Sequence, residues 1–120
     1  RGPEMAQYLF ILNDPPYGTE RSYNGLRLAR SLLDGDEGVR VVLIGDGAAC
    51  GVAGQKVPQG YYNVGDMIGG VLRRKGEVAV CGTCMDARGI AADRLVEGTR
   101  RGSMDLLAEW PGQADKVLVF

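Results

Sequence analysis

Two cysteines and an arginine lie in one short segment that has the residue types needed for thiol chemistry. Cys81, Cys84 and Arg88 are spaced at i, i+3 and i+7, and the small residues Gly82 and Thr83 separate the cysteines. If the segment is helical, this spacing places the three side chains on one face, with Arg88 one turn from Cys84. A thiolate is the nucleophilic form of cysteine, and a nearby cation or free backbone N–H groups lower its pKa. We therefore predict a reactive thiol here, with room for another sulfur atom to approach.

The residues alone leave several interpretations of this Cys-x-x-Cys pair open. Cys81 can act as a nucleophile whose persulfide anion is held by N–H groups near Gly82 and Thr83. A thioredoxin-like dithiol is an alternative, but its motif should precede a long helix, whereas Gly89 predicts a short one. A zinc site needs four ligands, usually Cys or His, and the chain has three cysteines and no histidine. We therefore expect no metal and no cofactor, and an inert, buried Cys81 is the remaining alternative.

The composition excludes several classes of function. Fourteen Lys and Arg against fifteen Asp and Glu give a formal charge of −1, so we expect no basic surface for nucleic acid or an anionic membrane. The absence of histidine removes the Ser–His and Cys–His nucleophile pairs and the usual neutral-pH general base. No apolar run approaches the roughly 18 residues of a membrane span. Three cysteines are too few and too odd in number for a disulfide framework, so we expect a reducing, cytoplasmic location.

Short apolar runs alternate with helical patterns along the chain, which predicts a doubly wound α/β fold. We expect strands over residues 6–13, 39–45, 77–81, 98–101 and 116–120. We expect helices over residues 19–34, 62–75, 90–96 and 103–110, the last ended by Pro111 and Gly112. Residues 82–89 are expected to form a loop. Because such alternation needs crossover connections, the sheet should be mainly parallel and covered on both faces.

The ends of the predicted strands place further candidates near the cysteine pair. In an open parallel sheet, binding sites lie beyond the carboxyl ends of the strands. Asn13 follows the first predicted strand and Cys50 lies in the segment after the second, so both are expected at the same edge as Cys81. We therefore include Asn13 and Cys50 as candidate binding residues with Gly82 and Thr83. Cys50 stands beside two alanines, however, which also suits a buried, inert thiol.

Several other polar and aromatic residues have purely structural explanations. Arg100 and Arg101 are expected on a solvated face or at a helix C-terminus, where cations favour the helix dipole. Asp46 is expected to cap the next turn, and Asp86 to be a surface carboxylate of the loop. Three aromatic residues are expected to pack rather than to hold a ligand: Tyr61, Tyr62 and Trp110.

Two segments, CGTCMDARG at residues 81–89 and ADKVLVF at residues 114–120, resemble the DsrE/DsrF-like (YchN-type) family of small sulfur-relay proteins. The resemblance extends as a single domain from Met5 to Phe120, and we expect residues 1–4 to be a vector-derived remnant. It implies a three-layer α/β/α sandwich with a mainly parallel sheet of about five strands. It also implies assembly as a homotrimer or homohexamer.

Relay members of this family carry sulfane sulfur as a persulfide on a cysteine at the end of the third strand. The matching position is Cys81, which precedes Arg88 and Gly89 by the interval of the TusD and DsrE branches. Cys84 departs from the general pattern and matches a Cys-x-x-Cys variety, in which a second thiol can resolve the persulfide. The resemblance therefore implies sulfur donor and acceptor proteins as partners.

The leading expectation is a persulfide-carrying sulfur-relay protein, a sulfur carrier or sulfurtransferase. The Cys81 thiolate would take the outer sulfur of a donor persulfide and yield it to an acceptor thiol, with Arg88 and nearby N–H groups lowering the thiol pKa. Cys84 would assist this step or resolve the persulfide. Two alternatives from other classes are a non-catalytic homo-oligomeric binding module and a dithiol redox or sensing protein.

Overall fold

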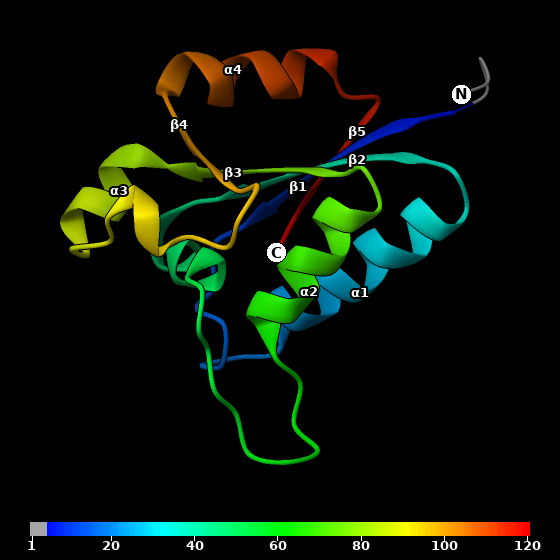
Figure 1. Cartoon of the computed structure of the whole chain (residues 1–120). Coiled ribbons are helices and arrows are strands. Elements are labelled where there is room, and N and C mark those ends of the chain that lie inside the picture. Colours follow the sequence, from blue (N-terminus) through cyan, green and yellow to red (C-terminus); the bar gives the residue numbers. More distant parts are fainter. Residues whose placement is uncertain (1–4) are drawn as a thin grey trace.

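A five-stranded sheet forms the centre of the computed structural model, which describes residues 5–120 (Figure 1). Residues 1–4, expected to be a vector-derived remnant, lie outside the described residues. The strands are β1 (Gln7–Leu12), β2 (Gly38–Leu43), β3 (Glu77–Cys81), β4 (Arg100–Gly102) and β5 (Lys116–Val119). They lie in the order β4-β3-β2-β1-β5, and every neighbouring pair is parallel. The predicted α/β class and parallel sheet are confirmed.

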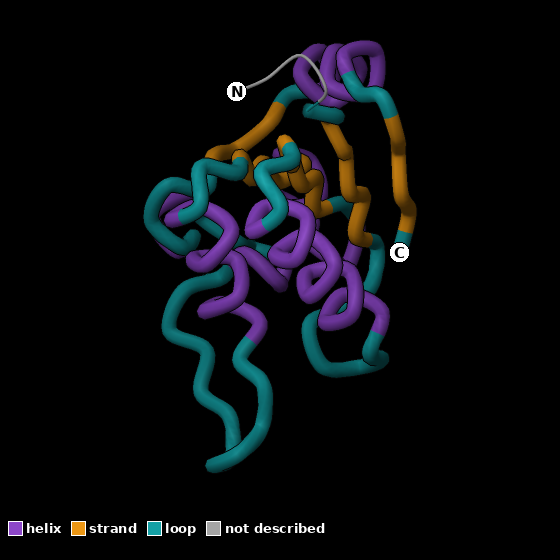
Figure 2. The backbone as a smooth tube through the Cα atoms, turned by 90° about the vertical axis from the view of Figure 1, so that its right-hand side faces the viewer, coloured by secondary structure: helices purple, strands orange, loops and turns teal. Residues whose placement is uncertain are grey.

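Helices cover the two faces of the sheet unequally (Figures 1 and 2). Helices α1 (Arg21–Asp34) and α2 (Val64–Arg73) pack side by side on one face, whereas α4 (Met104–Gln113) lies alone on the other. The chain moves one strand at a time from β1 to β4, and α4 then carries it back across the sheet to β5. Within residues 5–120, no helix is both long and apolar enough to span a bilayer.

Short helical segments gather where β2 and β3 end. The 3₁₀ segment η1 (Gly45–Gly51) follows β2, and helix α3 (Gly82–Ala87) continues directly from β3. The two segments contact each other because their strands are neighbours in the sheet. This edge of the sheet is therefore the place where side chains from separate parts of the chain meet.

Two buried clusters, one on each face of the sheet, make up the core. Successive strand residues point to opposite faces, so Phe10 and Val41 belong to the larger cluster under α1 and α2, whereas Leu9 and Val42 belong to the smaller one under α4. Both faces are covered, which explains why these strands are continuous apolar runs in the sequence. The smaller cluster is the one that contains Cys81, with Leu9, Val42, Ala79, Leu107 and Trp110.

The structure corrects two predictions around the cysteine pair. Residues 82–89, expected to be a loop, begin as helix α3, which runs from Gly82 to Ala87. The helix expected over residues 90–96 is reduced to the single turn η2 (Ala92–Arg94). The backbone at the end of η2 and just after it pairs instead with the exit of η1, through the N–H of Val96 on the carbonyl of Gly51 at 2.8 Å. These long-range hydrogen bonds favour an extended chain there.

The predicted end of the last helix is also wrong. Pro111 and Gly112 do not stop α4, which continues to Gln113. Proline removes one backbone donor from a helix, and near the end of α4 this costs only a single intrahelical hydrogen bond. The start of α4 is as expected, because the Ser103 side chain accepts a hydrogen bond from the Leu106 N–H at 3.3 Å.

Candidate functional site

The candidate site is built at the junction of β3 and α3. Cys81 is the last residue of β3 and also the N-cap of α3, so the first N–H groups of the helix lie close to its side chain. The backbone N–H groups of Thr83 and Cys84 lower the pKa of the Cys81 thiol. The Thr83 hydroxyl oxygen lies 3.3 Å from the Cys81 sulfur. Cys81 is 3% exposed. Its sulfur is therefore shielded from bulk water but surrounded by hydrogen-bond donors.

The two thiols of the pair have pKa values shifted in opposite directions. Burial raises the pKa of the Cys81 thiol, but hydrogen bonds from the Cys84 thiol, the Thr83 hydroxyl and two backbone N–H groups outweigh it and bring the pKa below its usual value. For Cys84, burial and its hydrogen bond to Cys81 raise the pKa, and the Gly45 N–H, 3.2 Å from the Cys84 sulfur, opposes them only in part. Of the two thiols, Cys81 therefore has the lowered pKa and Cys84 the raised one.

The guanidinium beside Cys81 is that of Arg101, on β4. Its two terminal nitrogens donate to the two carboxylate oxygens of Asp86 on α3, each at 2.9 Å. A Cβ atom built on Gly82 would lie 2.7 Å from Arg101 Nε, so the guanidinium lies directly over Gly82. The hydrogen bond to Asp86 and, to a smaller extent, the charge on Cys81 raise the pKa of Arg101. Arg101 was expected on a solvated face or at a helix C-terminus, and Asp86 as a surface loop carboxylate, so neither prediction included this ion pair.

Arg88 lies beside Cys84 rather than beside Cys81. It donates to the Cys84 carbonyl at 3.1 Å, and its Nη2 donates to Asp46 Oδ1 at 2.8 Å. Its charge lowers the pKa of Cys84 only slightly against the larger opposing effects. Asp46 does not cap a turn, as had been expected, because its carboxylate binds Arg88. This ion pair therefore connects η1 to the end of α3.

The other two sequence candidates lie outside this cluster. Cys50, in η1, is fully buried in the larger core cluster, and burial raises its thiol pKa to about 11. The Asn13 side chain donates to the carbonyl of Phe120 at 3.2 Å and so connects the end of β1 to the end of the chain. Across residues 5–120, no group of three or more His, Cys, Asp or Glu residues is arranged to hold a metal ion.

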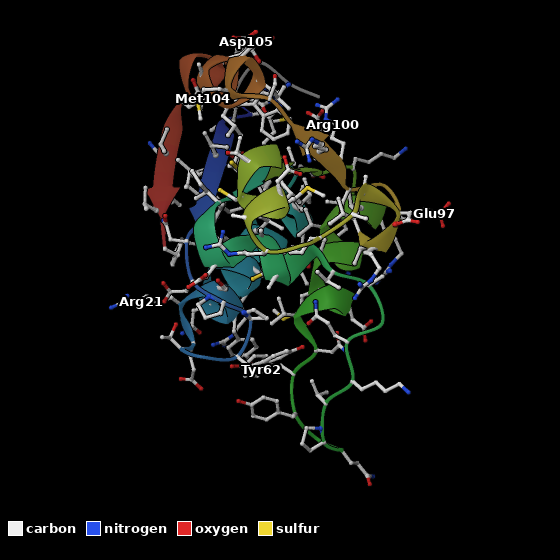
Figure 3. The ribbon with its side chains drawn as sticks, turned by 90° about the vertical axis from the view of Figure 1, so that its left-hand side faces the viewer. Arg21, Tyr62, Glu97, Arg100, Met104 and Asp105 are labelled. Carbon is white, nitrogen blue, oxygen red and sulfur yellow. The ribbon has the colours of Figure 1, made fainter. Side chains whose placement is uncertain are left out.

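A pocket of about 410 Å³ opens beside the Cys81 sulfur. The strand register places Gly102 of β4 next to Cys81 of β3, and the start of α4 follows immediately. Figure 3 shows Arg100 on β4 and Met104 at the start of α4. The pocket is lined by Cys81, Gly82, Thr83, Arg101, Gly102, Ser103 and Met104.

Sequence reasoning found the first three of these lining residues and missed the other four. The missing signal was the pairing of β3 with β4, which brings residues 101–104 to the end of β3. The predicted strand over residues 98–101 was too short and too polar to indicate its neighbour. Nothing in the local pattern of Arg100 and Arg101 shows which of them reaches the thiol.

The fold and the site together define a class of protein: a small parallel α/β domain with a cysteine of lowered pKa where its third strand ends. The model of the DsrE/DsrF-like family matches residues 6–120, and the chain belongs to this family. The family resemblance of the CGTCMDARG and ADKVLVF segments is thereby confirmed.

Relatives of known sequence and structure agree with this assignment. Protein YchN of Escherichia coli strain K12 is 36% identical over 118 residues, which cover 97% of this chain and 100% of the relative. Its crystal structure superposes with a TM-score of 0.90. Uncharacterized protein MK0008 of Methanopyrus kandleri is 34% identical over 110 residues, covering 92% of this chain and 90% of that protein. BT1422 of Bacteroides thetaiotaomicron, a conserved protein of unknown function, has a TM-score of 0.69 at 17% identity over 95% of both chains, which shows similarity of fold alone.

Proposed function

We propose that this protein carries sulfane sulfur as a persulfide on Cys81 and transfers it between thiol partners. The observation that carries the proposal is the environment of the Cys81 sulfur. That sulfur lies 3.3 Å from the Thr83 hydroxyl oxygen, and Cys84 and Thr83 lower its pKa. Cys81 also lines a pocket together with Arg101. A thiol whose pKa is lowered in this way is a nucleophile at neutral pH.

The transfer consists of two displacement reactions at sulfur. In the first, the Cys81 thiolate attacks the outer sulfur of a donor persulfide, a new S–S bond forms, the donor S–S bond breaks and the donor leaves as a thiolate. In the second, an acceptor thiolate attacks the outer sulfur on Cys81, and Cys81 leaves as a thiolate. No oxidant or reductant is consumed. The donors around Cys81 stabilise both anions that the cycle needs, the thiolate and the persulfide.

Cys84 is placed to control the lifetime of the persulfide. The two thiols are close enough for Cys84 to lower the pKa of Cys81 and for Cys81 to raise the pKa of Cys84. Attack of the Cys84 sulfur on the inner sulfur of the Cys81 persulfide forms a disulfide and releases hydrosulfide, which keeps the proton of the Cys84 thiol. The same proximity favours a second candidate function, a reversible Cys81–Cys84 dithiol. Because all of these steps need free thiols, we place the protein in the reducing cytoplasm.

Intact-mass measurement after incubation with inorganic hydropolysulfide tests the proposal. We expect the wild-type protein to gain sulfur that a reducing thiol removes, and Cys81→Ser to gain none. Cys50→Ser is the matched control and should gain as much as the wild type, because Cys50 lies in the core. Cys84→Ser should retain the added sulfur for longer than the wild type. Equal uptake by Cys81→Ser would contradict the proposal, and a Cys81–Cys84 disulfide without any sulfur adduct would favour the dithiol function.

Self-association forms part of the same proposal. Met104, Val117 and Val119 are 67%, 43% and 64% exposed. Val117 and Val119 pair in register with Leu9 and Ile11, which places them on the face that α4 alone covers. Apolar side chains exposed beside a sparsely covered sheet face support contact with further copies of the chain. The particle mass from light scattering measures the trimer or hexamer proposed here.

A further inference from the structure

The Arg101–Asp86 pair extends the proposed function to the kind of molecule that delivers the sulfur, and this inference rests on that function. Both terminal nitrogens of Arg101 are used by Asp86. Three of its five N–H bonds remain, the Nε–H and one on each terminal nitrogen, and the guanidinium lies over Gly82. Among residues 5–120, the structure shows no acceptor for the Nε–H group. Arg101 therefore keeps N–H donors beyond those that bind Asp86, together with its positive charge, at the pocket that it lines.

The position of Arg101 is held from both sides. Asp86 fixes the guanidinium through two hydrogen bonds to α3. On the other face of β4, Arg100 lies 5.3 Å from the centre of the Trp110 ring and donates to Glu77 at 3.2 Å. These contacts anchor the short edge strand on which Arg101 stands. A guanidinium fixed in this way loses little conformational entropy when it binds an anion.

The pocket lining carries a positive charge. Arg101 is the charged side chain among the lining residues, and the described residues contribute no carboxylate to the lining. The volume, about 410 Å³, falls in the range of small-molecule sites rather than extended protein interfaces. Because Cys81 is only 3% exposed, a donor must place its sulfane sulfur inside this pocket to be attacked.

We infer that the pocket takes a small anionic sulfur donor of the thiosulfonate class, of which thiosulfate is the simplest, with Arg101 binding its oxyanion group. A guanidinium matches the oxygens of a tetrahedral oxyanion and forms strong charge-assisted hydrogen bonds with them. Arg101 lies over Gly82, next to the attacking sulfur, so the oxyanion is held while the sulfane sulfur faces Cys81.

The atoms and charges of this loading step balance. The Cys81 thiolate attacks the sulfane sulfur of thiosulfate and forms the new S–S bond, while the S–S bond of thiosulfate breaks. The bonding pair leaves with the sulfonate group as sulfite, and Cys81 becomes a persulfide anion. No proton or external electron is needed. Arg101 is best placed to stabilise the charge that develops on the leaving sulfite.

The test measures loading of the whole protein from two donors, thiosulfate and hydropolysulfide, which lacks an oxyanion group. The variants are Arg101→Gln, Arg101→Lys and the control Arg94→Gln. The control removes the same charge from an exposed side chain outside the pocket lining. For Arg101→Gln we expect sulfite release from thiosulfate to fall about tenfold or more. Half-saturation should also need more thiosulfate, whereas hydropolysulfide loading should change much less. Arg101→Lys keeps the charge but loses the fork, and should lie between the two.

Each outcome separates the inference from the proposed function. If the wild type loads from hydropolysulfide but releases no sulfite from thiosulfate, the inference is wrong and the carrier function stands. The same conclusion follows if Arg101→Gln slows both donors equally, since Arg101 then acts on the thiolate and not on the donor. If the wild type loads from neither donor, the carrier function itself fails. Hydropolysulfide loading of each variant also shows that the variant is folded.

Discussion

Cys50 and Cys81 are two cysteines in corresponding places with opposite chemistry. Both lie at the carboxyl edge of the sheet, Cys50 in η1 after β2 and Cys81 as the last residue of β3, and they are 0% and 3% exposed. Burial raises the pKa of Cys50 to about 11, whereas hydrogen bonds outweigh burial at Cys81 and lower its pKa. Cys50 lies inside a packed hydrocarbon cluster, and Cys81 lies where helix N–H groups and a guanidinium converge. Exposure alone therefore does not distinguish a reactive thiol from an inert one.

Alkylation of the native protein at pH 7 should show the largest difference between the two thiols. With a pKa of about 11, only about one Cys50 in ten thousand is a thiolate at that pH. Cys81 ionises below the usual thiol pKa, so iodoacetamide should label it at least about a hundredfold faster than Cys50. Peptide mass mapping over time measures both rates. Equal labelling rates of Cys50 and Cys81 would contradict the difference in thiol pKa.

Gly82→Ala should lower the reactivity of the Cys81 thiol and so reduce its difference from Cys50. The new Cβ would lie 2.7 Å from Arg101 Nε, so the guanidinium must move away from the thiol. We expect the alkylation rate of Cys81 at neutral pH to fall several-fold, about 1 kcal/mol of lost anion stabilisation. Gly112→Ala is the matched control, because a Cβ there meets no atom within 4 Å. An unchanged alkylation rate in Gly82→Ala would show that Arg101 does not influence Cys81.

The raised pKa of Cys50 should make the free energy of unfolding depend on pH in the alkaline range. The pKa of Cys50 is raised above its unfolded value of 9.0 to about 11, so its stabilising contribution is complete below pH 9 and is lost as the pH rises toward 11. This contribution amounts to about 2–3 kcal/mol. Urea unfolding of the wild type and of Cys50→Ala at several pH values measures it. We expect the wild type to lose more stability than Cys50→Ala over this range, and parallel pH profiles would contradict the shift.

Much of the fold was predictable from local sequence. The apolar runs predicted β1, β2, β3 and β5, and β3 has the predicted bounds, Glu77–Cys81. Asp34 and Gly35 end α1, and Ser103 caps α4, because caps and turns depend on a few neighbouring residues. The errors over residues 82–96 arose where long-range backbone pairing and helix continuation determined the chain path.

The candidate site was predictable only in part. The sequence determined by itself that a cysteine with small neighbours would end the third strand, because that depends on residue type and short spacing. Only the tertiary structure decided which cation faces it. Arg101 reaches Cys81 through the pairing of β4 with β3 and through its ion pair with Asp86, fifteen residues earlier in the chain. Strand pairing depends on contacts between distant segments, and a three-residue polar strand carries no local pattern that indicates its partner.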